Sequence, residues 1–474
     1  MTHQGRRPGD RRVRVQRTRP EQFTVSTPRR LRAPLPPALV LVGGFAAMIA
    51  VGTIVLLLPV SSRAGTMTPV IDALFTATSA VCVTGLVVVD TGTYWSPFGQ
   101  AVILALIQVG GFGFMTSSTL LLLVLVGRRT TLRDRVLVGE SLGGLDVGAV
   151  GPLIRRVAIF TVIAELVGAV TLTVAFTASG EVDALGGAWW GLFHSVSAFN
   201  NAGFDVIGGF RSLTPFVDNW VIVPTVIVLV VLGGLGYAIA ADIWRRRSRG
   251  RMALETKLVL STSLVLLVAG ALFVGMSEWG NPATLGQLSP ADRVLNSVFT
   301  SVTARTAGFN TLDTAGLLEQ TLFVVIALMF IGGASGSTAG GIKVNTFSVL
   351  IIAIASTVRG DPSAQAFGRR IQHAVVYRAL SVTLLSIGVV FVLGLGLELA
   401  TDALFIEEIF EAVSAFGTVG LSMGITPDLD EVGRLMVTAG MFAGRLGPLT
   451  LVLALAARAH PVPYRPAVES VRIG

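Results

Sequence analysis

Four short segments of the chain share one pattern, in which an apolar run containing Ser or Thr leads into a turn of small residues at a glycine. Each segment opens on a phenylalanine, and the glycines recur at intervals of about 110 residues. The four glycines are Gly85, Gly203, Gly308 and Gly420. This spacing predicts a fourfold array of one unit, and such an array is typical of a pore with pseudo-fourfold symmetry.

Composition places the array in a membrane. The chain is 52% hydrophobic and 14% charged, its mean hydropathy is +0.74, and many apolar runs approach the roughly 20 residues that cross a bilayer. We therefore expect an all-α membrane protein with four tandem helix–pore loop–helix repeats: eight transmembrane helices and four re-entrant pore helices. The expected spans are 37–60, 98–126, 154–178, 217–241, 256–276, 320–356, 374–400 and 432–457.

Charge placement predicts the orientation. Arginines gather in the N-terminal segment and in alternate loops, whereas acidic residues gather in the other loops, so the positive-inside rule puts both termini in the cytoplasm. Nucleic acid is the other interpretation of a pI near 10.6, but the arginines are dispersed over short loops between spans. The expected layout is a basic tail at 1–35, repeats at 36–135, 150–250, 255–358 and 370–460, and a C-terminal tail at 461–474.

The apolar segment before each glycine has only about a dozen residues, too few to cross a bilayer as a helix. The chain should enter and return, which leaves extended backbone at membrane depth, where it is tolerated only inside protein or beside water. Glycine there turns carbonyls toward an axis, and four such strands can replace the hydration shell of a cation. One such turn alone would be an ordinary loop between helices, but four in matching positions favour a filter. The predicted filter residues are Val83, Thr84, Gly85, Asn201, Ala202, Gly203, Thr306, Ala307, Gly308, Thr418, Val419 and Gly420.

A second signature of small residues follows each filter segment, at 110–113, 233–236, 332–336 and 443–447. Small residues permit close helix packing in membranes, and generic packing would explain any one of them. The third version extends to 331–343 and holds too many glycines for a helix, so we expect the helix to break there. A phosphate-binding loop is the competing interpretation, but Val344 follows the lysine and no strand precedes the run.

The order of helix, glycine segment and helix, together with the sequences 193–204 and 303–310, resembles the Trk/Ktr/HKT superfamily of potassium transporters. Over residues 35–474 the chain is most similar to the KtrB-type membrane subunits of bacterial Ktr systems. The resemblance implies that the four glycines form a potassium filter; Gly85 stands where sodium-selective HKT members carry Ser. One departure is that the third repeat has one residue fewer between Thr303 and Gly308 than the others have there.

The resemblance also implies a gate and partners. An intramembrane loop at 332–343 would gate the path below the filter. Arg445 would lie below the filter, contact this loop and add an electrostatic barrier. K⁺ would be the transported ion, Na⁺ a candidate activator, and ATP or ADP would act only through a regulatory subunit. We expect a homodimer in the lipid of the bacterial cytoplasmic membrane, with a cytosolic KtrA-type RCK ring on loops 127–135 and 359–370, no covalently bound cofactor and no nucleic acid. The implied gating residues are Gly332, Gly333, Ser335, Gly336, Ser337, Thr338, Gly340, Gly341, Lys343 and Arg445.

Other polar residues have weaker assignments. Glu165 is expected to have a structural partner, and His194 to help start its pore helix. Acids near the outer mouth would concentrate cations or would be ordinary loop ends; they are Asp205, Asp313, Asp428 and Asp430.

Three alternatives remain beside the potassium pore. The first is a less selective, HKT-like Na⁺/K⁺ transporter. The second is a broken-helix secondary transporter for another solute, although such folds usually contain inverted repeats, whereas two spans per repeat give all four the same orientation. The third is an enzyme or scaffold, disfavoured because no nucleophile–base set or metal-ligand spacing is present.

Overall fold

The computed structural model describes residues 37–112, 150–245 and 252–447. The predicted N-terminal tail, the loop 127–135, the second half of the span 98–126, the end of the span 432–457 and the C-terminal tail lie outside these residues. The described helices all belong to one unit of the chain, Pro37–Gly474.

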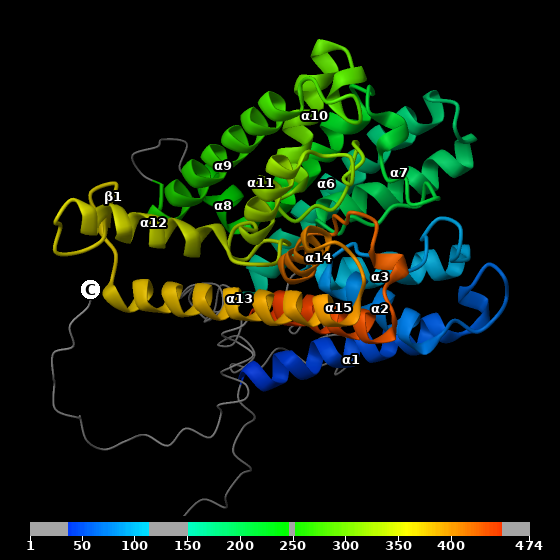
Figure 1. The fold of residues 1–474 in the computed structure, drawn as a ribbon, viewed down its shortest axis with the longest axis horizontal. Helices are drawn as coiled ribbons and strands as arrows, with labels where there is room; N and C mark the ends of the chain where they lie inside the picture. Colours follow the sequence, from blue (N-terminus) through cyan, green and yellow to red (C-terminus); the bar gives the residue numbers. More distant parts are fainter. Residues whose placement is uncertain (1–36, 113–149, 246–251, 448–474) are drawn as a thin grey trace, which may run out of the picture. The chain divides into compact units, whose positions relative to one another are not determined.

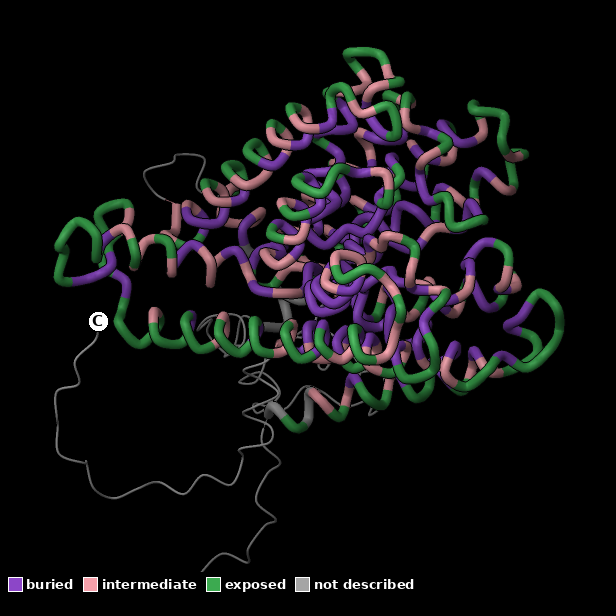
Figure 2. Tube along the Cα trace, in the orientation of Figure 1, coloured by how far each residue is buried: buried purple, intermediate pink, exposed green. Residues whose placement is uncertain are grey.

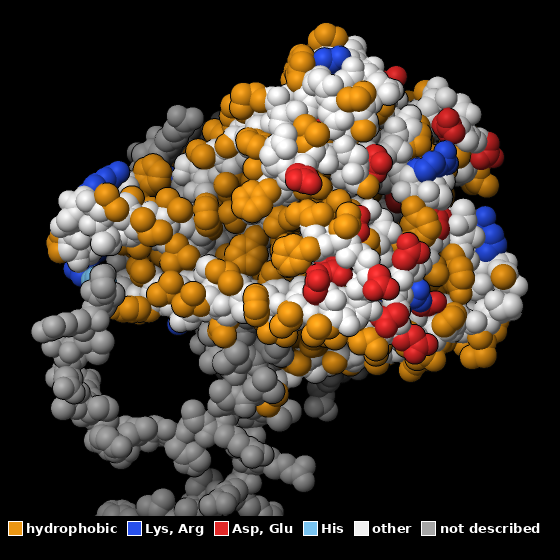
Figure 3. Space-filling view, viewed as in Figure 1, with side chains coloured by type: hydrophobic (Ala, Val, Ile, Leu, Met, Phe, Trp, Pro, Cys, Tyr) orange, Lys and Arg blue, Asp and Glu red, His pale blue; other side chains and the backbone are white. Residues whose placement is uncertain are grey.

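Four long apolar helices recur along the chain (Figure 1). Three of them contain stretches that are long and apolar enough to cross a membrane by length and composition: Arg155–Ala178, Leu254–Glu278 and His373–Ala400. Less than a third of the residues in these stretches are buried, and hydrophobic side chains cover the face over α12 and α13 in Figure 3. An apolar exterior of this extent suits lipid rather than water. The long helices are α1 (Pro37–Leu57), α6 (Val150–Ala178), α9 (Leu254–Glu278) and α13 (His373–Ala400).

A short helix precedes each of the four predicted glycine turns. The longest has 16 residues, or about 24 Å at 1.5 Å per residue, less than the roughly 30 Å of a bilayer core. Asp183 and Ser289 cap two of these helices by accepting hydrogen bonds from Gly186 N and Asp292 N. The short helices are α2 (Val70–Cys82), α7 (Ala184–Phe199), α10 (Pro290–Thr303) and α14 (Phe405–Gly417).

The helices that follow the glycine turns all lose helical backbone near the second glycine signature. α8 is kinked at Gly236 (φ 73°, ψ 157°), and α15 ends immediately before Gly447 (φ 79°). The break predicted within 320–356 is confirmed, because α11 ends at Phe330 and α12 begins only at Val344. The helices are α3 (Pro97–Gly111), α8 (Ile222–Arg245), α11 (Glu319–Phe330) with α12 (Val344–Val358), and α15 (Glu431–Leu446).

Minor elements complete the described chain. A two-stranded antiparallel hairpin pairs β1 with β2 between α12 and α13. The strands are β1 (Gln365–Ala366) and β2 (Arg369–Arg370), and the 3₁₀ helices are η1 (Pro59–Ser61), η3 (Thr214–Phe216), η5 (Leu285–Gln287) and η6 (Thr426–Asp428).

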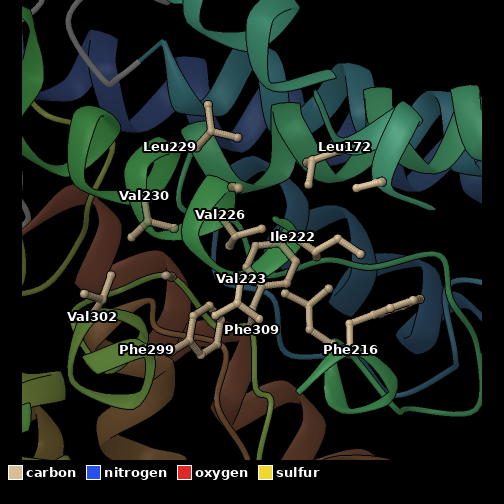
Figure 4. Packing of buried hydrophobic residues seen from close by; sticks show 14 of the residues in the cluster. Leu172, Phe216, Ile222, Val223, Val226, Leu229, Val230, Phe299, Val302 and Phe309 are labelled. Carbon is tan, nitrogen blue, oxygen red and sulfur yellow. The ribbon is translucent and has the colours of Figure 1, made fainter. Parts of the chain in front are cut away.

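The core lies where the short helices pack against the long ones, in the pairs α1–α2, α6–α7, α9–α10 and α13–α14. Figure 2 shows buried backbone in the interior and exposed backbone on the long helices. The phenylalanine that opens each repeated segment is at most 1% exposed, so the shared residue anchors each short helix. Phe299 packs near Phe309, Val223 and Val226 in one of these clusters (Figure 4).

The first and last quarters of the described chain are joined directly. Arg434 on α15 forms a salt bridge with Asp72 on α2, with 2.5 Å between Nη1 and Oδ1. The remaining guanidinium donors of Arg434 bond to Leu429 O and Pro427 O. This bridge fixes α2 against the segment that precedes α15.

Candidate ion pathway

The four glycine turns contact one another in a closed ring. All four glycines have positive φ, between +68° and +95°, a region that L side chains rarely adopt. A methyl group placed on any of them would strike the next turn, which is why only glycine fits. Such a methyl at Gly85, Gly203, Gly308 and Gly420 would lie, in that order, 2.4 Å from Ala202 O, 2.8 Å from Gly308 Cα, 2.5 Å from Val419 O and 2.2 Å from Thr84 O.

Backbone carbonyls lie between neighbouring glycines of this ring. The carbonyl of the residue before each ring glycine lies against the glycine of a neighbouring turn; Ala307 O, for example, would lie 2.9 Å from a methyl on Gly203. The ring therefore has one carbonyl from each turn, contributed by Thr84, Ala202, Ala307 and Val419. Carbonyl oxygens are ligands that can replace the water around a monovalent cation.

The ends of the short helices explain how the turns form. In three of them the N–H of the residue before the glycine donates to a carbonyl five residues back, as in Thr84 N to Ser79 O at 2.8 Å. This Schellman arrangement needs a left-handed residue at the turn. Here that residue is not glycine, which costs free energy that the surrounding packing must offset. The left-handed residues are Val83, Asn201 and Thr418, with Thr306 left-handed at the matching place of the third turn.

The third glycine turn is one residue shorter than the others, and the difference lies in the last turn of its helix. Ala307 N donates to Thr303 O at 2.9 Å, a separation of four residues instead of five. Gly308 still takes its place in the ring, between Gly203 and Gly420. The shortened spacing thus changes the helix end and not the register of the filter segment.

A cavity of about 290 Å³ lies on one side of the ring. All four ring glycines line it, together with the predicted mouth acids Asp205 and Asp313. Burial, and then the nearby charge of Asp90, raise the pKa of Asp205 to about 6. Asp430, by contrast, caps α15 by accepting from Gly433 N at 2.7 Å, as an ordinary helix-capping residue does.

The loop between α11 and α12 lies against the ring's other side. A parallel bridge between Ile331 and Ile342 closes its base. Ala334 N donates to Gly234 O at 2.9 Å, and Thr338 Oγ1 donates to Asn201 Oδ1 at 3.0 Å. The loop therefore bonds to the second quarter of the chain.

The loop also abuts the fourth glycine turn. A methyl on Gly340 would lie 1.9 Å from Thr418 Oγ1, and one on Gly341 would lie 3.2 Å from Gly417 Cα. The predicted gating residues are thus brought next to the predicted filter residues.

Arg445 ties the loop to the first quarter of the chain. Its side chain is 8% exposed, Nη1 donates to Thr338 O at 2.5 Å and Nη2 donates to Gly110 O at 2.7 Å. Lys343 donates to Ala339 O within the loop. Because buried charges are costly at membrane depth, carbonyl partners of this kind are what such residues require.

The second glycine signature packs against the short helices. A methyl on Gly110 would lie 2.0 Å from Val81 O, and one on Gly444 would lie 1.8 Å from Phe416 O. Gly233 has the same relation to Phe199 O, at 1.8 Å. The small residues therefore permit close approach, as the sequence predicted, and the surface approached is the carboxyl end of the preceding short helix.

Glu165 and His194 have structural surroundings. Glu165 accepts from Asn200 Nδ2 at 3.0 Å and from Gln108 Nε2 at 3.2 Å, which confirms the expected partner. The expectation for His194 was wrong, because α7 starts at Ala184 and the histidine lies in its second half, fully buried. Its Nδ1 pairs with the carbonyl of Trp190.

Arg305 is a buried polar residue near the ring to which the sequence pattern assigns no role. It is 8% exposed and lies directly before the left-handed Thr306. Its Nη2 donates to Gly332 O at 3.0 Å, at the start of the loop. The sequence signal for Arg305 is a charged residue inside the otherwise uncharged segment 299–309.

Apolar helices surround a ring of carbonyls, which has an acidic cavity on one side and a packed loop on the other. These features define an α-helical membrane protein with a site suited to cations. Within the part of the chain that the structure describes, no group of three or more His, Cys, Asp or Glu residues could hold a metal ion. The family model TrkH, described as a cation transport protein, matches residues 42–463. The chain therefore belongs to the TrkH family of cation transport proteins.

Individual relatives agree with this assignment. The chain is 40% identical over 422 residues to the Ktr system potassium uptake protein B of Bacillus subtilis, covering 89% of this chain and 93% of that protein. It is 38% identical over 452 residues to the potassium/sodium uptake protein NtpJ of Enterococcus hirae, covering 94% and 99%. The crystal structure of the potassium transporter TrkH from Vibrio parahaemolyticus has the same fold, with a TM-score of 0.67, 19% identity, and coverage of 90% and 86%.

Proposed function

We propose that this protein takes up potassium through the bacterial cytoplasmic membrane as the pore-forming subunit of a Ktr-type system. The observation that carries the proposal is the closed ring of Gly85, Gly203, Gly308 and Gly420, with one carbonyl from each turn facing the next glycine. A relative that is 40% identical is named a potassium uptake protein. Ion coordination rather than bond breaking is the chemistry of such a ring, and we propose no enzymatic activity.

The proposed architecture has four tandem repeats and eight membrane spans. The recurring order of long helix, short helix, glycine turn and second helix supports it, from α1 to α15. In this arrangement the acidic cavity faces outward, and both termini and the loop between α11 and α12 lie on the cytoplasmic side. The repeats would occupy 36–135, 150–250, 255–358 and 370–460.

The proposed filter consists of the three residues that end at each ring glycine. Their left-handed backbone holds the carbonyls in place, and the glycines leave the space that an ion needs. Selection for K⁺ over Na⁺ is the expected result of a Gly at position 85. The less selective alternative has one observation in its favour, since the relative NtpJ is named a potassium/sodium uptake protein.

The proposed gate is the loop 332–343 with Arg445. Its contacts with Asn201 and Thr418 would close the path immediately below the filter. Opening requires the loop to leave these contacts, and Arg445 would restrain it through Thr338 O. Flux should therefore depend on the number of bonds that hold the loop, while selectivity should not.

The proposed assembly is a homodimer with a cytosolic KtrA-type RCK ring, and nucleotide acts only through that ring. In support, two relatives are named Ktr system potassium uptake protein B. Na⁺ is proposed as an activator because of the resemblance to the Trk/Ktr/HKT superfamily.

The deciding experiment is cation uptake in a bacterial strain that lacks its own potassium uptake systems. The chain is expressed alone and then with a KtrA-type partner, and K⁺ and Na⁺ uptake are measured. Potassium-selective uptake that the partner stimulates supports the proposal. An absence of cation flux in both conditions, with the protein shown to be folded in the membrane, refutes it and favours another solute.

A further inference from the structure

A small cavity lies below the ring, between α8, α9 and α10, and the proposed transport function does not use it. Its volume is about 40 Å³, enough for a very small ligand. Val230 and Val302, labelled in Figure 4, form part of an apolar wall that also includes Val231, Leu235 and Leu267. The polar side chains that line it are Asn201, Ser263 and Arg305.

Two buried N–H groups at this cavity lack hydrogen-bond partners among the described residues. One is Arg305 Nε, since the guanidinium uses Nη2 for Gly332 O and Ser263 Oγ. The other is Asn201 Nδ2, since the amide oxygen accepts from Thr338. Both side chains are more than nine-tenths buried. An unpaired buried donor is costly and calls for an acceptor.

The charge at the cavity is also uncompensated. Arg305 stays protonated under all conditions that proteins meet, and its hydrogen-bond partners in the described chain, Gly332 O and Ser263 Oγ, are neutral. A buried cation without a counter-ion is expensive at membrane depth. A ligand that carries one negative charge and accepts hydrogen bonds would therefore satisfy both the charge of Arg305 and the unpaired N–H groups.

We propose that this cavity binds a small monovalent anion, with chloride as the physiological ligand, held by Arg305 Nε and Asn201 Nδ2. A halide only accepts hydrogen bonds, so the apolar part of the lining suits it. A water molecule would leave the charge of Arg305 uncompensated. A larger or doubly charged anion would exceed the volume and keep its hydration.

The site is connected to the loop between α11 and α12. Arg305 reaches from the cavity to Gly332 O, and Gly333 lines the cavity itself. Asn201 likewise reaches from the cavity to Thr338. A bound anion would therefore hold both side chains in the positions from which they contact the loop.

The direct test is anomalous diffraction from crystals of the full-length protein grown with bromide in place of chloride. The proposal expects a bromide peak within hydrogen-bond distance of both Arg305 Nε and Asn201 Nδ2. Ordinary density without an anomalous signal means a water molecule and overturns the proposal. This measurement uses the wild-type protein and needs neither transport activity nor a variant.

A second test measures thermal unfolding of the purified full chain at constant K⁺ while gluconate is exchanged for chloride. Chloride should raise the melting temperature, because a ligand of the folded state stabilises it. Arg305→Gln should weaken the apparent chloride affinity at least about tenfold, the effect of one charge-assisted hydrogen bond. The matched control is Arg293→Gln in the first turn of α10, the helix that ends just before Arg305; the donors of Arg293 bond to the carbonyls of Leu288, Trp279 and Gly286.

The outcomes separate the site from general stability. Arg293→Gln should keep the chloride dependence even where its melting temperature is lower. A chloride response that persists unchanged in Arg305→Gln assigns the ion to another place and overturns the proposal. Where Arg305→Gln does not fold, the bromide peak in the wild-type crystals decides.

Discussion

Gly85→Ser tests the filter most directly. A Cβ at this position would lie 2.4 Å from Ala202 O, about 1 Å inside the separation at which such atoms attract. A serine at φ +95° also adds about 1 kcal/mol of backbone strain, and relieving the contact in a packed ring costs about 1–3 kcal/mol more. The Ala202 carbonyl must therefore move out of the ring, and one of its four acceptors is misplaced.

The expected result is a loss of discrimination rather than a loss of folding. If about 1.4 kcal/mol of the strain falls on the K⁺-bound state alone, the preference for K⁺ over Na⁺ falls about tenfold. The assay is the ratio of K⁺ to Na⁺ uptake in the uptake-deficient strain, with the amount of protein in the membrane measured in parallel.

The matched control is Gly424→Ser. Gly424 also lines the mouth cavity and has φ +105°, but a methyl there meets nothing within 4 Å. It carries the same kind of backbone strain without a displaced carbonyl, so its ion preference should stay that of the wild type. An unchanged ratio in Gly85→Ser, or an equal loss in both variants, would refute the reasoning.

Three further predictions concern the loop, the mouth and the buried acid. Thr338→Val removes the bond to Asn201 Oδ1 and should raise K⁺ uptake with an unchanged K⁺/Na⁺ ratio; lower uptake in initial-rate measurements would contradict a closing role. Because the pKa of Asp205 is raised to about 6, the carboxylate is ionised at neutral pH and loses its charge as the external pH falls through 6, so uptake should decline there and Asp205→Asn should flatten this part of the pH profile; a decline that persists in the variant assigns it to another group. Glu165→Ala leaves the Gln108 amide without its acceptor and removes one of the acceptors of Asn200 Nδ2, and it should lower the free energy of unfolding by about 1–3 kcal/mol, measured by thermal or denaturant unfolding against the exposed control Glu181→Ala; equal effects in the two variants would show that Glu165 is not a structural acceptor.

The sequence predicts the four glycine turns because they recur at matching places after short apolar segments, whereas one glycine alone could end any helix. The four turns and the break after Phe330 follow from this rule. The order in which the turns contact one another does not follow from it. That order depends on packing between residues far apart in the chain, which local pattern does not encode.

Three further features could not be predicted from the sequence, each for a different physical reason. The kink at Gly236 lies in an apolar run whose pattern favours an unbroken helix, and helix propensity alone does not decide such a case. The third turn is one residue shorter because Ala307 N bonds to the carbonyl four residues back instead of five. The pattern of polar and apolar residues does not determine which of these two bonds forms. Arg305 lies within the third glycine segment, and the repeat pattern of that segment does not show that Arg305 also lines a separate cavity.

The closure of the ring between Gly420 and Thr84 bears on how the protein is made. These two residues are separated by most of the chain, and the salt bridge between Arg434 and Asp72 spans 362 residues. A nascent chain emerging from the ribosome cannot complete the ring until its last quarter has been inserted. A chain that terminates before its last quarter therefore lacks a quarter of the ring altogether.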